Sequence, residues 1–170
     1  METEQRIVVE AGEGASVSLG GVGVDFKISA AMTGGAFSVV EHPLDPGRLI
    51  PPHIHYNEDE LSYVLRGEIG VRIGDCDYVA GPGSYVFKPR GIPHTFWNAK
   101  AEPAHLLEII WPAGFEDFFA ALGELAATCP PEEFPERRAE LAREYDHYFV
   151  HPEWVPELKH RYDLRMLGED

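Results

Sequence analysis

The chain has 170 residues, of which 44% are hydrophobic and 25% are charged, and its formal net charge is −15. This length favours one domain with a core of its own, and the composition is that of a folded protein. So acidic a surface repels the phosphates of nucleic acids and of anionic membranes, and we expect neither as a partner. The sequence also contains no apolar run of about 18 residues, which excludes a membrane-spanning helix.

The N-terminal segment and the cysteines both indicate a cytoplasmic protein. Met1–Gly14 is acidic and has neither the basic start nor the apolar core of a secretion signal. Cys76 and Cys129 do not form a CxxC pair, and two thiols do not provide a disulfide framework. We therefore expect reduced thiols and a cytoplasmic location.

The first two thirds of the chain have the pattern of an all-β protein. Short segments rich in Val, Ile, Phe and Tyr alternate with turn residues at intervals of about 8–12 residues, which is typical of a sandwich or barrel. The clearest predicted strands are Phe37–Glu41, Leu61–Leu65, Ile69–Ile73 and Leu106–Ile110. The Gly- and Ser-rich segment 12–23 predicts a loop or a loose hairpin.

The last third of the chain has a helical pattern. Phe115–Leu125 has apolar residues at the spacing of one helix face, and further helices are predicted for Phe134–Tyr148 and Pro152–Leu167. Three short helices would hardly bury a core alone. We therefore interpret residues 113–170 as a helical extension of the same domain, packed on a β-barrel formed by residues 1–112.

Three histidines and one glutamate have the pattern of a metal site. His53 and His55 are two residues apart, so on a strand both imidazoles point to the same face. Glu60 follows a short turn, and His94 follows the sequence Pro-Arg-Gly-Ile-Pro. This mixed set of nitrogen and oxygen donors suits Fe, Mn, Ni, Co, Cu or Zn better than Ca or Mg. We predict one divalent transition metal, with positions left open for a substrate oxygen or dioxygen.

The spacing of these residues resembles the two motifs of the cupin superfamily. The first motif, G-x5-H-x-H-x3,4-E-x6-G, is matched by Gly47, His53, His55, Glu60 and Gly67. The second motif, G-x5-P-x-G-x2-H-x3-N, is matched by Gly83, Pro89, Gly91, His94 and Asn98. The resemblance implies a cupin jelly-roll β-barrel over roughly residues 26–111.

The carboxylate ligand has one lesser alternative. The motif spacing permits either Asp59 or Glu60, while the motif residue type and the count to Gly67 favour Glu60. Among the other histidines, His42 is a weak candidate for a second base or ligand. The remaining four are expected at the surface, three of them in the helical segment, and they are His105, His147, His151 and His160.

Four aromatic residues are candidates for a substrate pocket. By strand alternation, Phe96 shares the inward face of His94. Phe87 and Phe37 are further candidates for the lining, and Tyr56 for the mouth of the barrel. The competing interpretation is plain barrel core for the phenylalanines and an exposed loop aromatic for Tyr56.

A second resemblance concerns function. One short barrel followed by helices, with the stretches Tyr56–Leu65 and Val86–Asn98, is similar to small bacterial quercetin 2,3-dioxygenase-like proteins. It implies an oxygenase acting on a small enol, phenol or flavonol-like substrate, with Glu60 accepting the substrate proton. The alternatives are a non-catalytic metal-dependent binding or sensing barrel and a cupin isomerase or lyase. The resemblance also implies a homodimer, in which Arg6–Glu10 is a candidate swapped or edge-paired strand.

Overall fold

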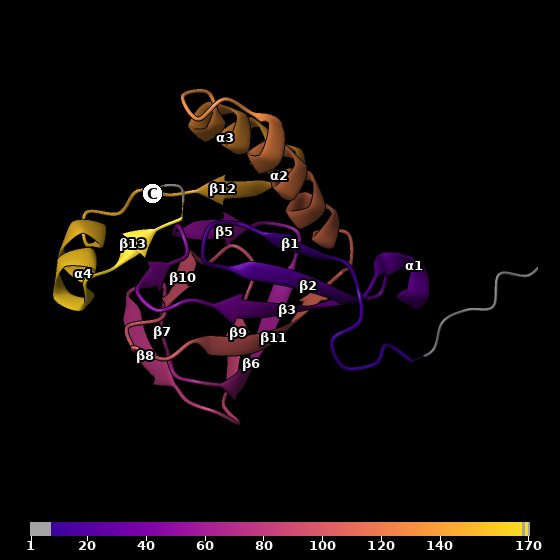
Figure 1. Ribbon diagram of the computed structural model, residues 1–170, viewed down its shortest axis with the longest axis horizontal. Helices are drawn as coiled ribbons and strands as arrows, with labels where there is room; N and C mark the ends of the chain where they lie inside the picture. Colours follow the sequence, from indigo (N-terminus) through magenta and orange to yellow (C-terminus); the bar gives the residue numbers. More distant parts are fainter. Residues whose placement is uncertain (1–7, 168, 170) are drawn as a thin grey trace, which may run out of the picture.

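The computed structural model describes residues 8–167 and 169. In this part of the chain, two β-sheets enclose a common core and helices lie at one end and one side (Figure 1). The first sheet has the strand order β1-β2-β3-β11-β6-β9. Its strands are β1 (Ser16–Ser18), β2 (Gly23–Ile28), β3 (Ser38–Leu44), β11 (Ala104–Trp111), β6 (Asp59–Arg66) and β9 (Tyr85–Lys88).

The second sheet has the order β12-β5-β10-β4-β13, and β7 joins it by pairing with both β10 and β8. Its strands are β12 (His147–Phe149), β5 (His53–His55), β10 (His94–Trp97), β4 (Arg48–Leu49), β13 (Arg165–Met166), β7 (Ile69–Ile73) and β8 (Cys76–Ala80). This architecture confirms the all-β fold with a helical segment that the sequence predicts.

Burial alternates along the central strands, as the two-residue period of a strand requires. The buried residues of β11 and β6 are Ala104, Leu106, Glu108, Ile110, Glu60, Ser62 and Val64. Leu106 lies opposite Val64, whereas Glu108 lies opposite Ser62. The interior is therefore apolar at one end of these strands and carries polar groups further along, where the candidate site lies.

Two helices cover the polar end of the barrel. Helix α2 (Glu116–Thr128) buries Phe118 and Leu122 in one apolar cluster with Ile110 of the first sheet. Helix α3 (Phe134–Glu144) packs against α2, and both lie over β12 (Figure 1). None of the helices in the described residues combines the length and the hydrophobicity that crossing a bilayer requires.

The second predicted helix is too long at its C-terminal end. Helix α3 ends at Glu144, and Asp146, at a φ of 49°, turns the chain into strand β12. This strand pairs with β5, so that His147 lies opposite His55. The C-terminal segment also supplies β13, which runs parallel to β4. The C-terminal segment therefore adds two strands to the second sheet besides its helices, which local periodicity does not reveal.

The remaining elements differ from the sequence expectation in small ways. Helix α4 (Val155–Tyr162) is shorter than predicted and ends at Asp163, which has a left-handed φ of 51°. The single-turn helix α1 (Ala30–Thr33) is not predicted, because four residues carry no periodic pattern. Segment 12–23 contains β1 and the turn of a hairpin, whose second strand, β2, begins at Gly23. Part of the predicted strand Arg6–Glu10 lies outside the described residues, and residues 8–10 adopt no regular structure.

One titratable side chain of β3 is buried in this interior. His42 is 5% exposed, and its Nδ1 lies 3.0 Å from the carbonyl oxygen of Gly23, which accepts its hydrogen. Burial lowers the pKa of His42 from 6.5 to about 4, and the nearby ammonium of Lys88 adds to this effect, while the hydrogen bond to Gly23 opposes it. The imidazole is therefore neutral near pH 7.

We propose that the helical segment and the barrel unfold as one unit, and Phe118→Ala tests this. Removing this buried ring should lower the free energy of unfolding by about 3–5 kcal/mol. Denaturant unfolding followed by circular dichroism and by tryptophan fluorescence should give one shared transition. The exposed Glu124→Ala on the same helix should change the stability by less than about 0.5 kcal/mol. Two separate transitions would contradict the single unit.

The buried His42 should make the fold sensitive to acid. Its folded-state pKa of about 4 lies below the unfolded value of 6.5, so the unfolded chain binds more protons between these two pH values. Stability from this residue is therefore complete above pH 6.5 and is lost as the pH falls toward 4. Between pH 7 and pH 4, the free energy of unfolding of the wild type should fall by about 3 kcal/mol more than that of His42→Gln. Urea unfolding at each pH measures these free energies. If they fall in parallel for the two proteins, His42 is not a source of the acid sensitivity.

Candidate metal centre and cavity

The structure brings together the four side chains that the sequence predicts as ligands. Strand β5 supplies His53 and His55, β6 supplies Glu60 and β10 supplies His94. One donor atom from each lies within 4.8 Å of the others, and all four side chains are buried. His94 Nε2 is 3.1 Å from Glu60 Oε2, and His55 Nε2 is 3.4 Å from Glu60 Oε1.

Neighbouring oxygens orient the three imidazoles. His53 Nδ1 lies 2.7 Å from the carbonyl oxygen of Pro51, and His94 Nδ1 lies 3.2 Å from that of Ile92, so each Nδ1–H donates to a carbonyl. His55 Nδ1 lies 3.4 Å from Glu58 Oε2. With the hydrogens on Nδ1, the lone pairs of the Nε2 atoms are free to bind a metal.

The donor set fits a divalent transition metal. Burial lowers the pKa of His53 and of His94, so these imidazoles are neutral near pH 7 and ready to bind a cation. Three imidazole nitrogens with one carboxylate form the mixed set that such ions prefer. The alternative ligand Asp59 does not belong to this group, because its carboxylate accepts hydrogen bonds from the backbone and guanidinium of Arg90, both at 2.8 Å.

A buried chain of charged groups continues from Glu60. Lys88 Nζ lies 3.0 Å from Glu60 Oε2 and 2.8 Å from Glu108 Oε1. Ser62 donates a hydrogen bond of 2.8 Å to the second oxygen of Glu108. The strand register explains this chain, because Glu60 lies opposite Lys88 and Ser62 lies opposite Glu108.

This arrangement separates the two carboxylates in their proton affinity. Burial alone would raise the pKa of Glu60, but Lys88, His55 and His94 hold it well below its usual value. Burial raises the pKa of Glu108 to about 7, and the negative charge of Glu60 adds to this, while Lys88 and Ser62 oppose it. Burial also opposes the charge of Lys88, but its two carboxylate partners raise its pKa overall.

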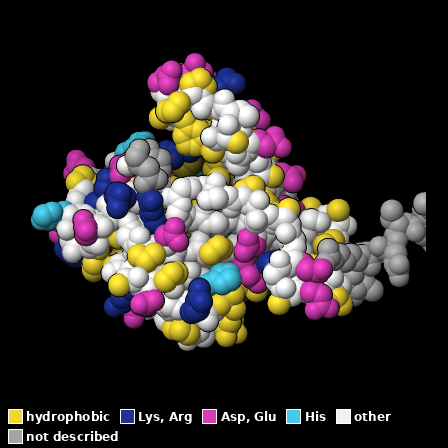
Figure 2. Space-filling view, in the orientation of Figure 1, with side chains coloured by type: hydrophobic (Ala, Val, Ile, Leu, Met, Phe, Trp, Pro, Cys, Tyr) yellow, Lys and Arg dark blue, Asp and Glu magenta, His cyan; other side chains and the backbone are white. Residues whose placement is uncertain are grey.

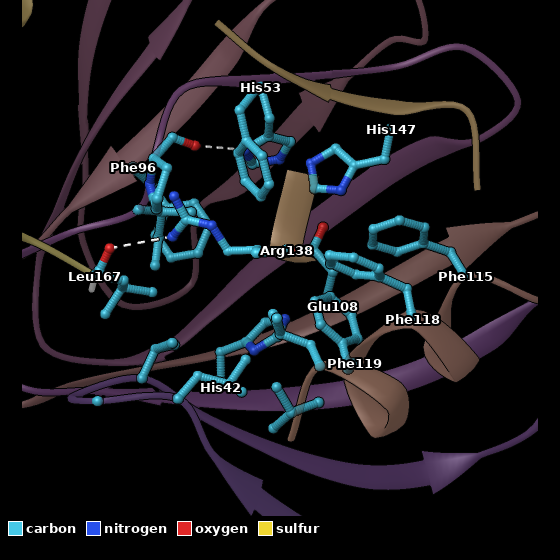
Figure 3. Close-up of a pocket in the computed structure, with 18 of the residues that line it drawn as sticks. His42, His53, Phe96, Glu108, Phe115, Phe118, Phe119, Arg138, His147 and Leu167 are labelled. Atoms are coloured by element: carbon cyan, nitrogen blue, oxygen red, sulfur yellow. Dashed lines mark hydrogen bonds between the residues drawn. The ribbon is translucent and has the colours of Figure 1, made fainter. Parts of the chain in front are cut away.

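A cavity of about 260 Å³ adjoins the cluster and is mostly aromatic and aliphatic. His53, His55 and Glu60 lie in its wall, together with Lys88 and Glu108. Figure 3 shows Phe115, Phe118 and Phe119 on one side of this space. On the surface, a hollow with hydrophobic walls separates the α2–α3 pair from the barrel (Figure 2). The size and lining of the cavity suit a small, mainly apolar ligand.

Only one of the four predicted pocket aromatics lines this cavity. Phe96 does so. Phe37, Phe87 and Tyr56 are 40%, 52% and 54% exposed and are not part of its wall. Phe87 lies on the outer face of β9, where its ring stacks on that of Trp111. The next residue, Lys88, points inward instead, since neighbouring residues of a strand face opposite sides. Phe37 precedes β3, and Tyr56 lies against Tyr148 beyond the end of β5.

The expectation that His147 lies at the surface is wrong. Its side chain is 4% exposed and lines the cavity, with its ring parallel to that of His55 at a centroid distance of 4.8 Å. The cause is the pairing of β12 with β5, which carries His147 inward. A local signal exists in the run His-Tyr-Phe-Val after Asp146, which is richer in strand-forming residues than the helix before it.

Three charged residues of the cavity wall are absent from the sequence prediction: Lys88, Glu108 and Arg138. Lys88 and Glu108 lie on the two strands that pair with the strand of Glu60. Sequence alternation could identify them only if that pairing were already known. Arg138 lies on α3, whose contact with the barrel is a tertiary feature. His42, the weak candidate of the sequence analysis, also lines the cavity but does not belong to the donor cluster.

Comparisons with known proteins agree with this fold. Residues 40–110 match the family described as Cupin domain. The structure of a predicted oxalate decarboxylase from Thermotoga maritima is 26% identical, with a TM-score of 0.55 over 61% of this chain and 97% of that one. Comparison with curated proteins gives no match.

Two less similar structures share the fold. An RmlC-like cupin from Shewanella frigidimarina is 19% identical, with a TM-score of 0.56 over 66% of this chain and 96% of that one. KdgF from a Halomonas species is 16% identical, with a TM-score of 0.56 over 64% of this chain and 94% of that one. The matched domain contains all four clustered donor residues. The chain thus contains a cupin domain at residues 40–110, and its described residues have the two-sheet cupin fold of these structural neighbours.

Proposed function

We propose that this chain is a metal-dependent oxygenase acting on a small enol, phenol or flavonol-like molecule. One observation carries the proposal: His53, His55 and Glu60 belong to the buried donor cluster and also form part of the cavity wall. A ligand in the cavity would therefore lie beside the metal site, shielded by an aromatic lining. The choice of reaction is supported by the resemblance of the sequence to small bacterial quercetin 2,3-dioxygenase-like proteins.

His53, His55, Glu60 and His94 would hold the metal. When bound, a divalent transition metal supplies Lewis acidity and, where it is redox-active, electron exchange with dioxygen. The donor set supports Fe, Mn, Ni, Co, Cu and Zn alike, so the proposal specifies one divalent transition metal and leaves its identity to measurement.

Glu60 is the proposed acceptor of the substrate hydroxyl proton. Although burial opposes its charge, Lys88 and the neighbouring histidines keep its pKa low, so the carboxylate is ionised at neutral pH. Lys88 lies between Glu60 and Glu108 and balances the negative charge at this end of the cavity. The rings of Phe115 and Phe118 would exclude water from the reacting atoms.

A non-oxidative lyase is the second candidate. It is favoured by the similarity to the Thermotoga maritima structure, whose description is a predicted oxalate decarboxylase. The same donor cluster would serve such a reaction, because a Lewis acid also stabilises the charge left by a departing carboxyl group. Turnover that continues under strict anaerobiosis would select this candidate.

The proposal includes a homodimer. Aromatic side chains on the outer face of β9 and its neighbours support it, because Tyr85 and Phe87 are 72% and 52% exposed. Tyr85 lies against Tyr63, and Phe87 against Trp111, which extends this apolar surface. A second copy of the chain would remove the surface from water. The cytoplasmic location likewise stays a proposal, based on the two free thiols Cys76 and Cys129.

Glu58→Gln tests the metal site apart from any reaction. Glu58 Oε2 lies 3.4 Å from His55 Nδ1, so the loss of its charge should leave the imidazole less well oriented. We expect the affinity for zinc, measured by competition with a chelator, to fall about 10- to 100-fold. The neighbouring Asp59→Asn removes a carboxylate outside the cluster and should leave the affinity unchanged. Equal affinities in both variants would contradict this role.

Oxygen uptake tests the proposed reaction. Protein stripped of metal and reloaded with iron, manganese, nickel, cobalt, copper or zinc is mixed with catechol, acetylacetone or quercetin in an oxygen electrode. At least one redox-active metal should support uptake. Per bound metal, Glu60→Gln should lower the rate by about 10²- to 10⁴-fold, as expected for loss of a proton acceptor. Asp59→Asn should retain the wild-type rate.

Two results would reject the oxygenase. The first is no oxygen uptake with any metal in the series. The second is an unchanged rate in Glu60→Gln at equal metal content. Ligand binding without turnover, measured by calorimetry, would instead favour a binding or sensing barrel.

A further inference from the structure

The cavity has further polar groups in its wall, which come from the C-terminal segment of the chain. Arg138 enters it from α3 and His147 from β12, and both are labelled in Figure 3. His147 stacks on His55 and lies edge-on to His53, with centroid distances of 4.8 Å in both cases. The C-terminal segment therefore places an imidazole beside the metal site and a guanidinium in the same cavity.

These two side chains have unused hydrogen-bonding capacity. Arg138 Nη1 donates to the carbonyl oxygen of Leu167 at 3.3 Å, but its buried Nε has no acceptor. Both ring nitrogens of the buried His147 also lack a hydrogen-bond partner among the described residues. Buried polar groups in native proteins are nearly always satisfied, so such a pair in a cavity wall points to a bound group.

The charge of Arg138 is also unbalanced. No carboxylate in the described residues forms an ion pair with it, whereas Lys88 has two carboxylate partners. The guanidinium carbon lies 4.6 Å from the ring centre of Phe149 and 5.9 Å from that of Phe134, so its neighbours there are aromatic rings, which attract a cation but carry no compensating charge. In a chain of net charge −15, this cation gives the cavity a local attraction for an anion.

We infer that the cavity binds a small aromatic or enol acid, with its carboxylate on Arg138 and its hydroxyl directed toward the donor cluster. A planar guanidinium matches a carboxylate through two parallel hydrogen bonds, and His147 offers a further donor beside them. The apolar body of the ligand lies against Phe115, Phe118 and Phe119. This inference rests on the proposed function, since it names the substrate class of the same site.

The residues that select the acid lie outside the matched cupin domain. Arg138 and His147 follow residue 110, where the match ends. The barrel thus provides the metal site, and the C-terminal segment provides the recognition of the carboxylate. A purely structural role for Arg138 would instead consist of holding Leu167 and stacking on Phe149. The two roles differ in whether Arg138 distinguishes an acid from its ester.

Calorimetry with matched ligands tests the inference. The probes are para-hydroxybenzoate, para-hydroxyphenylacetate and their methyl esters, added to the full chain in metal-free and in zinc-loaded form. At least one acid should bind the wild type about ten times more tightly than its ester. Arg138→Met keeps an apolar stem but removes the charge, and it should lower acid affinity by about 10- to 100-fold while leaving ester affinity unchanged.

Two further variants keep the test decisive. Arg138→Lys retains the charge and should retain part of the preference for the acid. This variant also keeps the test possible if Arg138→Met does not fold. Arg137→Gln is the control, because the neighbouring Arg137 is exposed, pairs with Glu140 at 3.3 Å and does not line this cavity. It should bind acid and ester as the wild type does. Thermal unfolding of each variant shows that the fold is intact.

The inference is overturned if no acid binds, if acid and ester bind equally, or if Arg138→Met weakens both to the same degree. Because zinc is not redox-active, this binding test does not depend on oxygen uptake. A preference for the acid without any oxygen uptake would reject the oxygenase and keep the recognition site. Oxygen uptake on neutral phenols without a preference for the acid would do the reverse.

Discussion

The buried carboxylate of Glu60 is the constraint on which the rest of the site depends. Placing an ionised carboxylate in a protein interior costs several kcal/mol unless cations and hydrogen-bond donors surround it. Here Lys88 lies 3.0 Å away, and His94 and His55 approach its two oxygens. A metal held by the same four residues would add positive charge at the same point. Glu108 pairs with Lys88 in turn, and Ser62 donates a hydrogen bond to Glu108.

The division between barrel and C-terminal segment follows from this constraint. A rigid sheet can hold charged groups opposite each other, as Glu60 and Lys88 show, because the strand register sets their separation. The barrel alone would leave these groups open to water. Phe118 and Phe119 of helix α2 cover them, together with Phe115 just before it, while α3 and β12 add Arg138 and His147. The cavity is thus a product of both segments, with the metal site on one and the proposed recognition of the substrate on the other.

The accuracy of the sequence predictions depended on how local each feature is. The strands near 61–65, 69–73 and 106–110 and the helix near 115–125 were predictable from local periodicity, and the structure contains all of them. Phe87 was misplaced, because alternation does not say which of two neighbours faces inward without a partner strand. His147 was misplaced for a related reason, since its burial depends on pairing with β5, far earlier in the chain.

By itself, the sequence determined the all-β fold, the helical segment and the residues that converge as His53, His55, Glu60 and His94. The strands and helices are indicated by local periodicity, whereas Glu60 and His94 were linked to His53 and His55 by the resemblance to the two cupin motifs. Only the tertiary structure decided what faces those residues: Lys88, Glu108, Arg138 and His147 arrive from other strands and from a helix. Their positions follow from strand register and from helix packing on the barrel, which are set by contacts between distant segments.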